Sequence, residues 1–581
     1  MNYIEDFNGR TDLINGYGNN ALMLYALQLK FEISDIVSVA SDALTDGGND
    51  KKCDLIYVDS DTGVAVIAQS YNKQSPHEHD LAPENKASDL NTASTWVLSQ
   101  DPDNVPEQIK EQVRLLQSSI ESNLISVIYF WYVHNLNESN NPKVREELAA
   151  MQASARTLLK SNFPQSETEL FALEVGNETI ETWYNTSSRQ ITISDTLSVA
   201  TPKVGFELDG GKWRAYITAV SAEWLKCQYK KYSNDLFSRN PRTYLGSGKK
   251  KNKINLGIMK TIDEQPNNFW AYNNGITALV NNYSVTREGK EEELTITGIA
   301  IINGAQTTGA ISSVDNLKCA WIPIRFIVCE DISIIDDIIS NNNKQNEILP
   351  SDLRSNDKTQ NRLRKEFEPY AKLYYSGGRR GNIRPSRSKE ILDPYIVAQS
   401  LLSFHGDCVT AYNSKNDLWS NDQLYSSIFP DNLTAEHIIF TYSLSRAFDV
   451  YKLMLQKKAD ERTEIEEKQH TYMSKRGSKM LSIFTISKCM EGIVGKRIRD
   501  SWTLKFLDNS DFDTLVNLWL LVIKAVLPLS CTALEAALND GLRSKERSAN
   551  EADKVVGFFA AVQDTLRPQL KKFTDAIEQT F

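Results

Sequence analysis

The sequence predicts a multidomain α/β protein whose last third is mostly α-helical, and three observations lead to this expectation. The chain has 581 residues, about four times the ~150 residues of a typical domain. Short β-rich runs alternate with helical patterns as far as about residue 402, and beyond it apolar residues recur at helical spacing. The hydrophobic share of 41% and the charged share of 24% are those of a globular protein. We expect three domains, over 1–204, 205–402 and 403–581.

Charge, cysteine content and the first residues narrow the class of protein. The formal net charge of −10 argues against a protein that coats nucleic acid with its whole surface. The seven cysteines form no C-x-x-C pair, so neither a disulfide framework nor a zinc ribbon is expected. Glu5 and Asp6 stand where a secretion signal would be basic and then apolar. The longest apolar run, 518–529, is shorter than the ~20 residues that cross a bilayer. We expect a cytoplasmic protein without a membrane span.

The first domain is predicted to alternate helices and strands. Residues 19–31 have the pattern of a helix, and the β-rich runs 54–58 and 64–69 are joined by Asp-Ser-Asp-Thr-Gly, which suits a hairpin turn. The remaining elements expected are a helix after Pro106, a strand within 124–133, a helix over 143–159 and a strand over 170–175. Pro202 and the Gly210-Gly211 pair suggest a boundary near this point.

The predicted hairpin places oxygen-bearing side chains at the ends of two adjacent strands. Asp54 begins the first strand and Gln69 ends the second. Side chains alternate along a strand, so Gln69 and Tyr71 project from the same face. Magnesium-dependent nucleases hold their hard cation with oxygen ligands that converge in this way. We therefore predict a Mg²⁺ or Mn²⁺ site at Asp54 and Gln69.

These residues resemble the PD-(D/E)xK nuclease superfamily, in the branch where glutamine replaces the second acid. The resemblance implies a lysine two positions after Gln69, where this chain has Tyr71. Lys73 has the right parity and is the candidate cation, although it lies ~13 Å from Gln69 along an ideal strand. Glu32 is the expected third metal ligand, with Asp50 as the alternative. An active nuclease and an inactive remnant kept for binding both stay open.

The middle of the chain is rich in asparagine and glycine. Asn273, Asn274 and Gly275 suit a tight turn with positive φ. Further on, the apolar run 298–302 breaks at Asn303-Gly304, and Ala305 begins a helical pattern that includes Gln306, Thr307 and Thr308. A strand, a glycine turn and a helix start form an anion-binding geometry. The alternative is that the amides satisfy irregular backbone.

Several short sequence motifs in this region, called words below, occur in an order that resembles the family of abortive phage infection proteins, AIPR. The words are Asn-Pro-Arg-x-Tyr-Leu-Gly (240–246), Asn-Leu-Gly-Ile-Met-Lys-Thr (255–261), Phe-Trp (269–270) with Asn-Asn-Gly-Ile-Thr (273–277), Ile-Asn-Gly-x-Gln-Thr (302–307), Asn-Asn-Lys-Gln-Asn (342–346) and Asp-Leu-Arg-Ser-x-Asp (352–357). The resemblance covers roughly 205–400. It implies a bacterial antiviral role, and the family commonly has a PD-(D/E)xK-like domain in front. The helical last third lies outside these motifs.

Two segments are basic, although the chain as a whole has a negative net charge. One is the lysine cluster within 249–253. The other follows two tyrosines and is the predicted nucleic-acid contact; it consists of Arg379, Arg380, Arg384, Arg387 and Lys389.

The leading hypothesis is a phage-defence protein that hydrolyses DNA or RNA phosphodiesters with a divalent metal, while the asparagine-rich domain holds a phosphate-bearing ligand. The rival is a non-enzymatic sensor or scaffold that acts through a partner. A homo-oligomer and a phage-derived or operon-encoded protein partner are compatible with either role. A nucleotide-driven motor is disfavoured, because the chain contains no G-x-x-x-x-G-K-[ST] motif.

Overall fold

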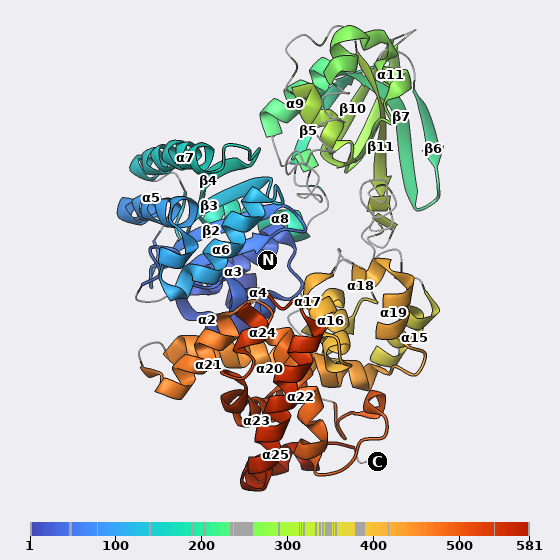
Figure 1. The fold of residues 1–581 in the computed structure, drawn as a ribbon. Coiled ribbons are helices and arrows are strands. Elements are labelled where there is room, and N and C mark those ends of the chain that lie inside the picture. The colour runs from blue at the N-terminus through green and yellow to red at the C-terminus, as the bar shows by residue number, and fades with distance from the viewer. Residues whose placement is uncertain are drawn as a thin grey trace. The chain divides into compact units, whose positions relative to one another are not determined.

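The computed structural model describes most of the chain and is drawn in Figure 1. The described residues are 3–45, 49–77, 79–138, 141–188, 191, 193–201, 205–232, 236–237, 259–288, 291–312, 314, 317, 320–329, 331, 334–335, 338–339, 342, 351, 354, 357–377, 390–415, 417–458, 461–509, 511–539 and 541–578; within these ranges the side chains of 185–188, 194, 200, 287–288, 291–292 and 306 are not described.

The N-terminal sheet begins with the predicted hairpin. Strands β1 (Leu55–Asp59) and β2 (Val64–Tyr71) are antiparallel, while β2, β3 (Val127–His134) and β4 (Glu169–Val175) are parallel, in the order β1-β2-β3-β4. The turn forms because the Asp59 carboxylate accepts the N–H groups of Asp61 and Thr62, and Gly63 supplies φ of 74°. The predicted hairpin and the following strands are therefore present.

Helices cover both faces of this sheet (Figure 1). One face packs against α5 (Glu84–Ser99), α6 (Glu107–Glu121) and α7 (Pro142–Asn162) in a core that includes Ile67 and Phe130. The opposite face is aromatic: Phe31, at the end of α3 (Ala21–Phe31), stacks on Trp131 with ring centroids 5.7 Å apart, and Trp131 also contacts Trp183 of α8 (Asn177–Ser188). Because Gln69 has the parity of Ile67, it belongs to the face that carries α5–α7.

The central sheet has the order β5-β10-β8-β11-β7-β6, and β9 pairs with β10. Only the β8–β11 pair is parallel among its described pairings. Its elements are β5 (Ile193–Ala200), β6 (Phe206–Asp209), β7 (Trp213–Ser221), α9 (Ala222–Tyr232), α11 (Phe269–Tyr272), β8 (Ile276–Leu279), β9 (Asn282–Glu288), β10 (Glu291–Asn303), α12 (Ala305–Ser312) and β11 (Trp321–Cys329). Strand β5 precedes the predicted boundary at residue 204 and pairs with β10 of this sheet.

The C-terminal part is helical, as the apolar spacing predicted, apart from a two-stranded parallel pair, β12 (Leu373–Tyr375) with β13 (Glu390–Leu392). Its main helices are α15 (Lys358–Phe367), α16 (Pro394–Phe404), α17 (Cys408–Asn413), α18 (Asp417–Ser420), α19 (Asp422–Ile428), α20 (Ala435–Lys458), α21 (Glu464–Ser474), α22 (Ser478–Val494), α23 (Phe512–Ser530), α24 (Glu535–Asn539) and α25 (Lys545–Asp575).

Helix α23 has the length and composition of a membrane span, with a mean hydropathy of 1.7. It is longer than the apolar run of 518–529, since it starts at Phe512 and ends at Ser530. In the structure 56% of this window is buried inside the protein. Trp519 lies in the core and donates its indole N–H to the carbonyl of Phe440 in α20. The burial is that of a core helix.

The chain forms two compact units. A short segment that lies between two parts of the first unit in the sequence belongs to the second unit in the structure. Unit 1 comprises 1–33 and 48–347, and unit 2 comprises 34–47 and 348–581. The segment 34–47 carries α4 (Ile36–Ala43), whose N-cap residue Asp35 accepts the N–H of Ser38 and pairs with Arg446 of α20 at 2.7 Å. Nothing in the local sequence pattern had predicted an element here.

Candidate functional site

The hairpin brings Asp54 and Gln69 together as a cross-strand pair. The N–H of Asp54 donates to the carbonyl of Ala68, which places Asp54 opposite Gln69 at the end of β2. The Gln69 side-chain Nε2 donates to Asp54 Oδ2 at 2.9 Å. The backbone N–H and the hydroxyl of Ser70 donate to the same oxygen at 2.7 and 3.1 Å. The predicted juxtaposition is thus present, and Ser70 is a third member that sequence reasoning did not include.

The pair is largely covered by protein. Asp54 is 6% exposed and Gln69 is 4% exposed. Gln69 Oε1 is buried and has no hydrogen-bond partner within the described part of the chain. Leaving such an acceptor unsatisfied costs about 1–3 kcal/mol. Burial raises the pKa of the adjacent Cys53 thiol, and the Asp50 and Asp54 carboxylates raise it further.

Lys73 lies beyond the end of β2 and is held there by two residues, Asn135 and Asp80. Asn135, just after β3, accepts the backbone N–H of Lys73 and donates its amide to the Lys73 carbonyl, each at 2.8 Å. The Lys73 ammonium pairs with Asp80 at 2.6 Å. This hydrogen bond is the main reason that the pKa of Asp80 lies below its usual value. Tyr71, in the position where the resemblance implies lysine, pairs in register with His134 of β3.

The two candidates for a third metal ligand lie in different places. Glu32 is exposed and ends α3 in a left-handed conformation with φ of 49°. Its neighbour Phe31 packs on the face of the sheet that is opposite to Gln69. Asp50 precedes the hairpin, and its carboxylate accepts the N–H of Lys52. In the described ranges, no group of three or more His, Cys, Asp or Glu residues could hold a metal ion.

The oxygen donors nevertheless fit a hard cation. Mg²⁺ is usually held by one or two carboxylates, with waters and substrate phosphates completing its shell, so a three-acid cluster is not required. Asp54 provides a carboxylate, and the buried Oε1 of Gln69 is an unsatisfied oxygen beside it. The set of donors is therefore chemically compatible with Mg²⁺ or Mn²⁺.

The asparagine-rich turn of the central sheet is organised by its own side chains. Asn273 accepts the N–H of Gly275 at 2.9 Å and donates to the hydroxyl of Thr307 at 3.3 Å. Gly275 has φ of 82°, whereas Asn273 has φ of −104°, so the predicted positive φ belongs to the glycine. Asn274 lies between them, just before β8. These bonds assign Asn273 a structural role in the turn.

The predicted strand, glycine turn and helix start are present at β10 and α12. Strand β10 ends at Asn303, Gly304 has φ of 106°, and α12 begins at Ala305. Asn303 donates its amide to the carbonyl of Asn342. Thr307 is 7% exposed and Thr308 is fully buried, so the hydroxyls at this helix start face protein rather than solvent. The side chain of Gln306 lies outside the described residues.

One residue of this region, Arg325, was missed by sequence reasoning. Arg325, in β11, donates to the hydroxyl of Thr277 at 2.6 Å and to the side-chain oxygen of Asn342 at 2.9 Å. Arg325 is exposed. A single arginine within the apolar run 321–329 gives no sequence pattern, and only the parallel pairing of β11 with β8 brings it beside Thr277. The cluster thus contains a cation that the motifs alone did not reveal.

The lysines within 249–253 lie outside the described residues, as does the predicted nucleic-acid contact, Arg379, Arg380, Arg384, Arg387 and Lys389.

The fold and the two sites define a class of protein: a multidomain α/β chain with a mixed N-terminal sheet that carries an acid–amide pair, a larger central sheet with an amide–arginine cluster, and a helical C-terminal part. The model of the family described as AIPR protein matches residues 237–526, and this match supports the AIPR family. The match extends beyond the motif region of 205–400 into the helical part, and it does not reach the N-terminal sheet. It is consistent with a bacterial abortive-infection role.

Comparison with curated proteins finds no match, and comparison with solved structures finds none either.

Proposed function

We propose that this protein is a metal-dependent nuclease of phage defence, and that its N-terminal sheet cleaves nucleic-acid phosphodiester bonds. The observation that carries the proposal is the Asp54–Gln69 pair at the end of β2, with the buried Gln69 Oε1 unsatisfied beside the carboxylate. A buried acceptor without a partner is uncommon in a folded protein and calls for an explanation such as an absent ion.

Each residue has a distinct task in this proposal. Asp54 and Gln69 would hold the cation, and Ser70 orients the carboxylate through two hydrogen bonds to Oδ2. When bound, the ion lowers the pKa of a water molecule and neutralises charge on the phosphate. Lys73 would contribute a positive charge near the substrate if its ion pair with Asp80 opens.

The test is cleavage by the full-length protein of plasmid, linear DNA and RNA, with Mg²⁺, with Mn²⁺ and with EDTA. Asp54→Ala should abolish metal-dependent cleavage. Asp61→Asn is the matched control, since Asp61 is an exposed acid in the turn of the same hairpin, and it should cleave like the parent. Equal cleavage by Asp54→Ala and the parent would refute the proposal.

A second candidate function has its own support. Asp54 and Gln69 are almost completely covered, and the Lys73 ammonium is already engaged by Asp80. Both features suit a degenerate domain that binds without cutting. On this alternative the protein acts as a sensor or scaffold through a partner. Absence of cleavage on every substrate, together with undiminished defence by the Asp54→Ala protein in infected cells, would favour it over the nuclease.

The central cluster is proposed to hold a phosphate-bearing ligand. The side chains of Asn273 and Asn303 form hydrogen bonds with the protein's own backbone. The cation Arg325 is therefore the residue that would contact the ligand. Arg325→Gln should weaken binding of a phosphate-bearing probe such as ATP. Lys260→Gln removes an exposed charge of the same unit and should leave the affinity unchanged. Equal affinities for both variants would remove Arg325 from the site.

A further inference from the structure

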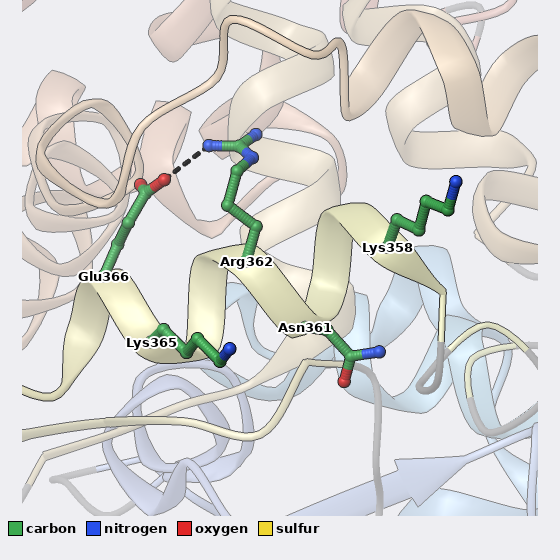
Figure 2. Close-up of a pocket in the computed structure, with 5 residues that line it drawn as sticks. All are labelled: Lys358, Asn361, Arg362, Lys365 and Glu366. Atoms are coloured by element: carbon green, nitrogen blue, oxygen red, sulfur yellow. Dashed lines mark hydrogen bonds and ion pairs between the residues drawn. The ribbon is translucent and has the colours of Figure 1, made fainter.

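Helix α15 carries a pocket of about 500 Å³ on its outer side. The lining residues all come from this one helix, as Figure 2 shows; they are Lys358, Asn361, Arg362, Lys365 and Glu366. Three of the five are cations and one is an acid. The pocket lies in unit 2 and is separate from both candidate sites described above.

The sequence fixes which side of α15 faces outward. Asp357 caps the helix by accepting the N–H of Gln360 at 3.0 Å. Gln360, Leu363 and Phe367 recur at helical spacing and are buried in unit 2. Two hydrogen bonds anchor Gln360 further: its side-chain oxygen accepts one from the Tyr375 hydroxyl, and its amide nitrogen donates one to the Tyr425 hydroxyl. The charged residues therefore occupy the opposite side on a firmly seated helix.

The single carboxylate of the pocket is already engaged. Glu366 Oε1 pairs with Arg362 at 2.5 Å (Figure 2). Glu366 Oε2 accepts the N–H of Ala435, the first residue of α20, at 3.0 Å. A carboxylate at the N-terminus of α20 is favourable, because the helix dipole is positive there. Glu366 thus serves α20 and Arg362, and it is not available to neutralise the other two cations.

The cations retain capacity for an anion. Within the described part of the chain, neither Lys358 nor Lys365 forms an ion pair. Arg362 uses Nη1 for Glu366 and for the carbonyl of Leu433, while its Nη2 is buried and has no acceptor among those residues, so the two lysines are the cations that an anion would meet first. Asn361 accepts a hydrogen bond from Arg364, which holds a further guanidinium beside the pocket. Positive charge is concentrated here, in a protein whose net charge is −10.

We propose that the α15 pocket binds phosphate groups, and that the nucleic-acid backbone supplies them. Lysine and arginine side chains, with polar amides, are the usual partners of backbone phosphates. The inference rests on the nucleic-acid partner of the proposed function and adds a binding site for it in unit 2. Free nucleotides present the same chemistry, so the experiment distinguishes the two sources.

The test measures equilibrium binding by the full-length protein in EDTA, where metal-dependent cleavage cannot occur. The probes are a fluorescein-labelled single-stranded oligonucleotide and ATP. The pocket variant is Lys358→Gln with Lys365→Gln, which leaves Arg362, Glu366 and the anchoring residues intact. The control is Lys571→Gln with Lys572→Gln, because these two exposed lysines lie on α25 of the same unit and their loss changes the charge equally. Circular dichroism confirms that both variants are folded.

The pocket variant should bind the oligonucleotide about tenfold more weakly than the control, with a slope of log affinity against log salt that is smaller by about 1.4, since each single-strand phosphate contact contributes about 0.7. Loss of ATP binding with unchanged oligonucleotide binding would support the phosphate site and identify a free nucleotide as the source. Equal binding of both probes by both variants, or no binding by the parent, would overturn the inference. The nuclease proposal is tested separately, by the cleavage assay with Mg²⁺ or Mn²⁺. If the parent cleaves in that assay, the nuclease proposal stands even when the binding test gives either of these results.

Discussion

Asp35 and Arg446 are 411 positions apart in the sequence and form an ion pair of 2.7 Å with side chains only 5% and 6% exposed. Burial raises the pKa of Asp35, but the Arg446 guanidinium and the N–H of Ser38 outweigh it, so this pKa lies below its usual value. Arg446 also pairs with Glu390, whose pKa is raised by burial in spite of the guanidinium. The pair joins α4 to α20 within unit 2.

Asp35→Ala should lower the free energy of unfolding of unit 2 by about 3–5 kcal/mol, because it leaves the Arg446 charge buried with one partner fewer. Hydrogen exchange of peptides from α4 and α20 measures the effect. Asp564→Asn, which removes a surface pair with Arg567 in the same unit, should cost no more than about 1 kcal/mol. Equal exchange in the two variants would contradict the assigned role of Asp35.

The buried pair of His405 and His437 should make unit 2 sensitive to acid. His437 Nδ1 donates to the carbonyl of Leu504 at 2.8 Å, so its Nε2 must accept from His405 Nε2 at 2.9 Å. Burial lowers the pKa of His437 to about 4; burial and then the charge of His437 lower that of His405 to about 3. Both values lie below the ~6.5 of an unfolded histidine, so the stability from the neutral pair is present above pH ~6.5 and is lost as the pH falls.

His405→Gln, which keeps a donor for His437, should reduce this loss by about 1.4 kcal/mol per pH unit between pH ~6.5 and 5. Urea unfolding at several pH values measures the slope. The comparison is made between variants because Asp449, whose pKa is raised by burial, contributes in the opposite direction. His77→Gln changes an exposed histidine of unit 1 and should keep the parental slope. An unchanged slope in His405→Gln would refute the prediction.

Gln69→Glu should convert the hairpin pair into a stronger cation site. Two carboxylates side by side repel, so the variant should melt at a lower temperature than the parent in EDTA. Mn²⁺ should restore its stability, by about 2.7 kcal/mol when the ion is at a hundred times its Kd. Differential scanning fluorimetry with and without Mn²⁺ measures this. Gln74→Glu adds the same charge at an exposed position nearby; if it responds to Mn²⁺ equally, the response does not come from Asp54.

Gly275→Ala should destabilise the central sheet far more than Gly211→Ala does. The two glycines have nearly the same positive φ, 82° and 81°, so both substitutions carry the ~1–2 kcal/mol strain of a left-handed residue. A Cβ at Gly275 would lie 2.7 Å from the carbonyl oxygen of Pro323, whereas one at Gly211 would meet nothing within 4 Å. Thermal melting of both variants gives the comparison, and equal melting temperatures would show that the Pro323 contact relaxes freely.

Much of the fold could be predicted because local patterns coincide with burial. The strand run of 64–69 and the helix run of 19–31 correspond to β2 and α3, since both runs are apolar almost throughout and nearly all of their residues are buried. The mixed α/β character and the helical C-terminal part were predicted correctly for the same reason. The domain boundaries at 204 and 402 stay predictions.

The candidate site was predictable only in part. The predicted hairpin placed Gln69 beside Asp54, and in the structure Gln69 Nε2 lies 2.9 Å from Asp54 Oδ2. Arg325 and α4 could not be found in this way. Their positions depend on partners that are distant in sequence: Thr277 contacts Arg325, and Arg446 contacts the N-cap residue of α4. The local spacing of apolar residues carries no information about such contacts.

The excursion of 34–47 into unit 2 means that no single cut divides this chain into two self-supporting proteins. A fragment that ends at residue 347 would retain α4 but lose every unit 2 residue that covers Ile36 and Ala40, both buried in the intact chain. Its complement, starting at 348, would lack the carboxylates that pair with Arg446 and Lys452 in the intact chain, those of Asp35 and Asp42. Anyone who wishes to separate the N-terminal sheet for biochemistry must excise or replace that loop as well as truncate.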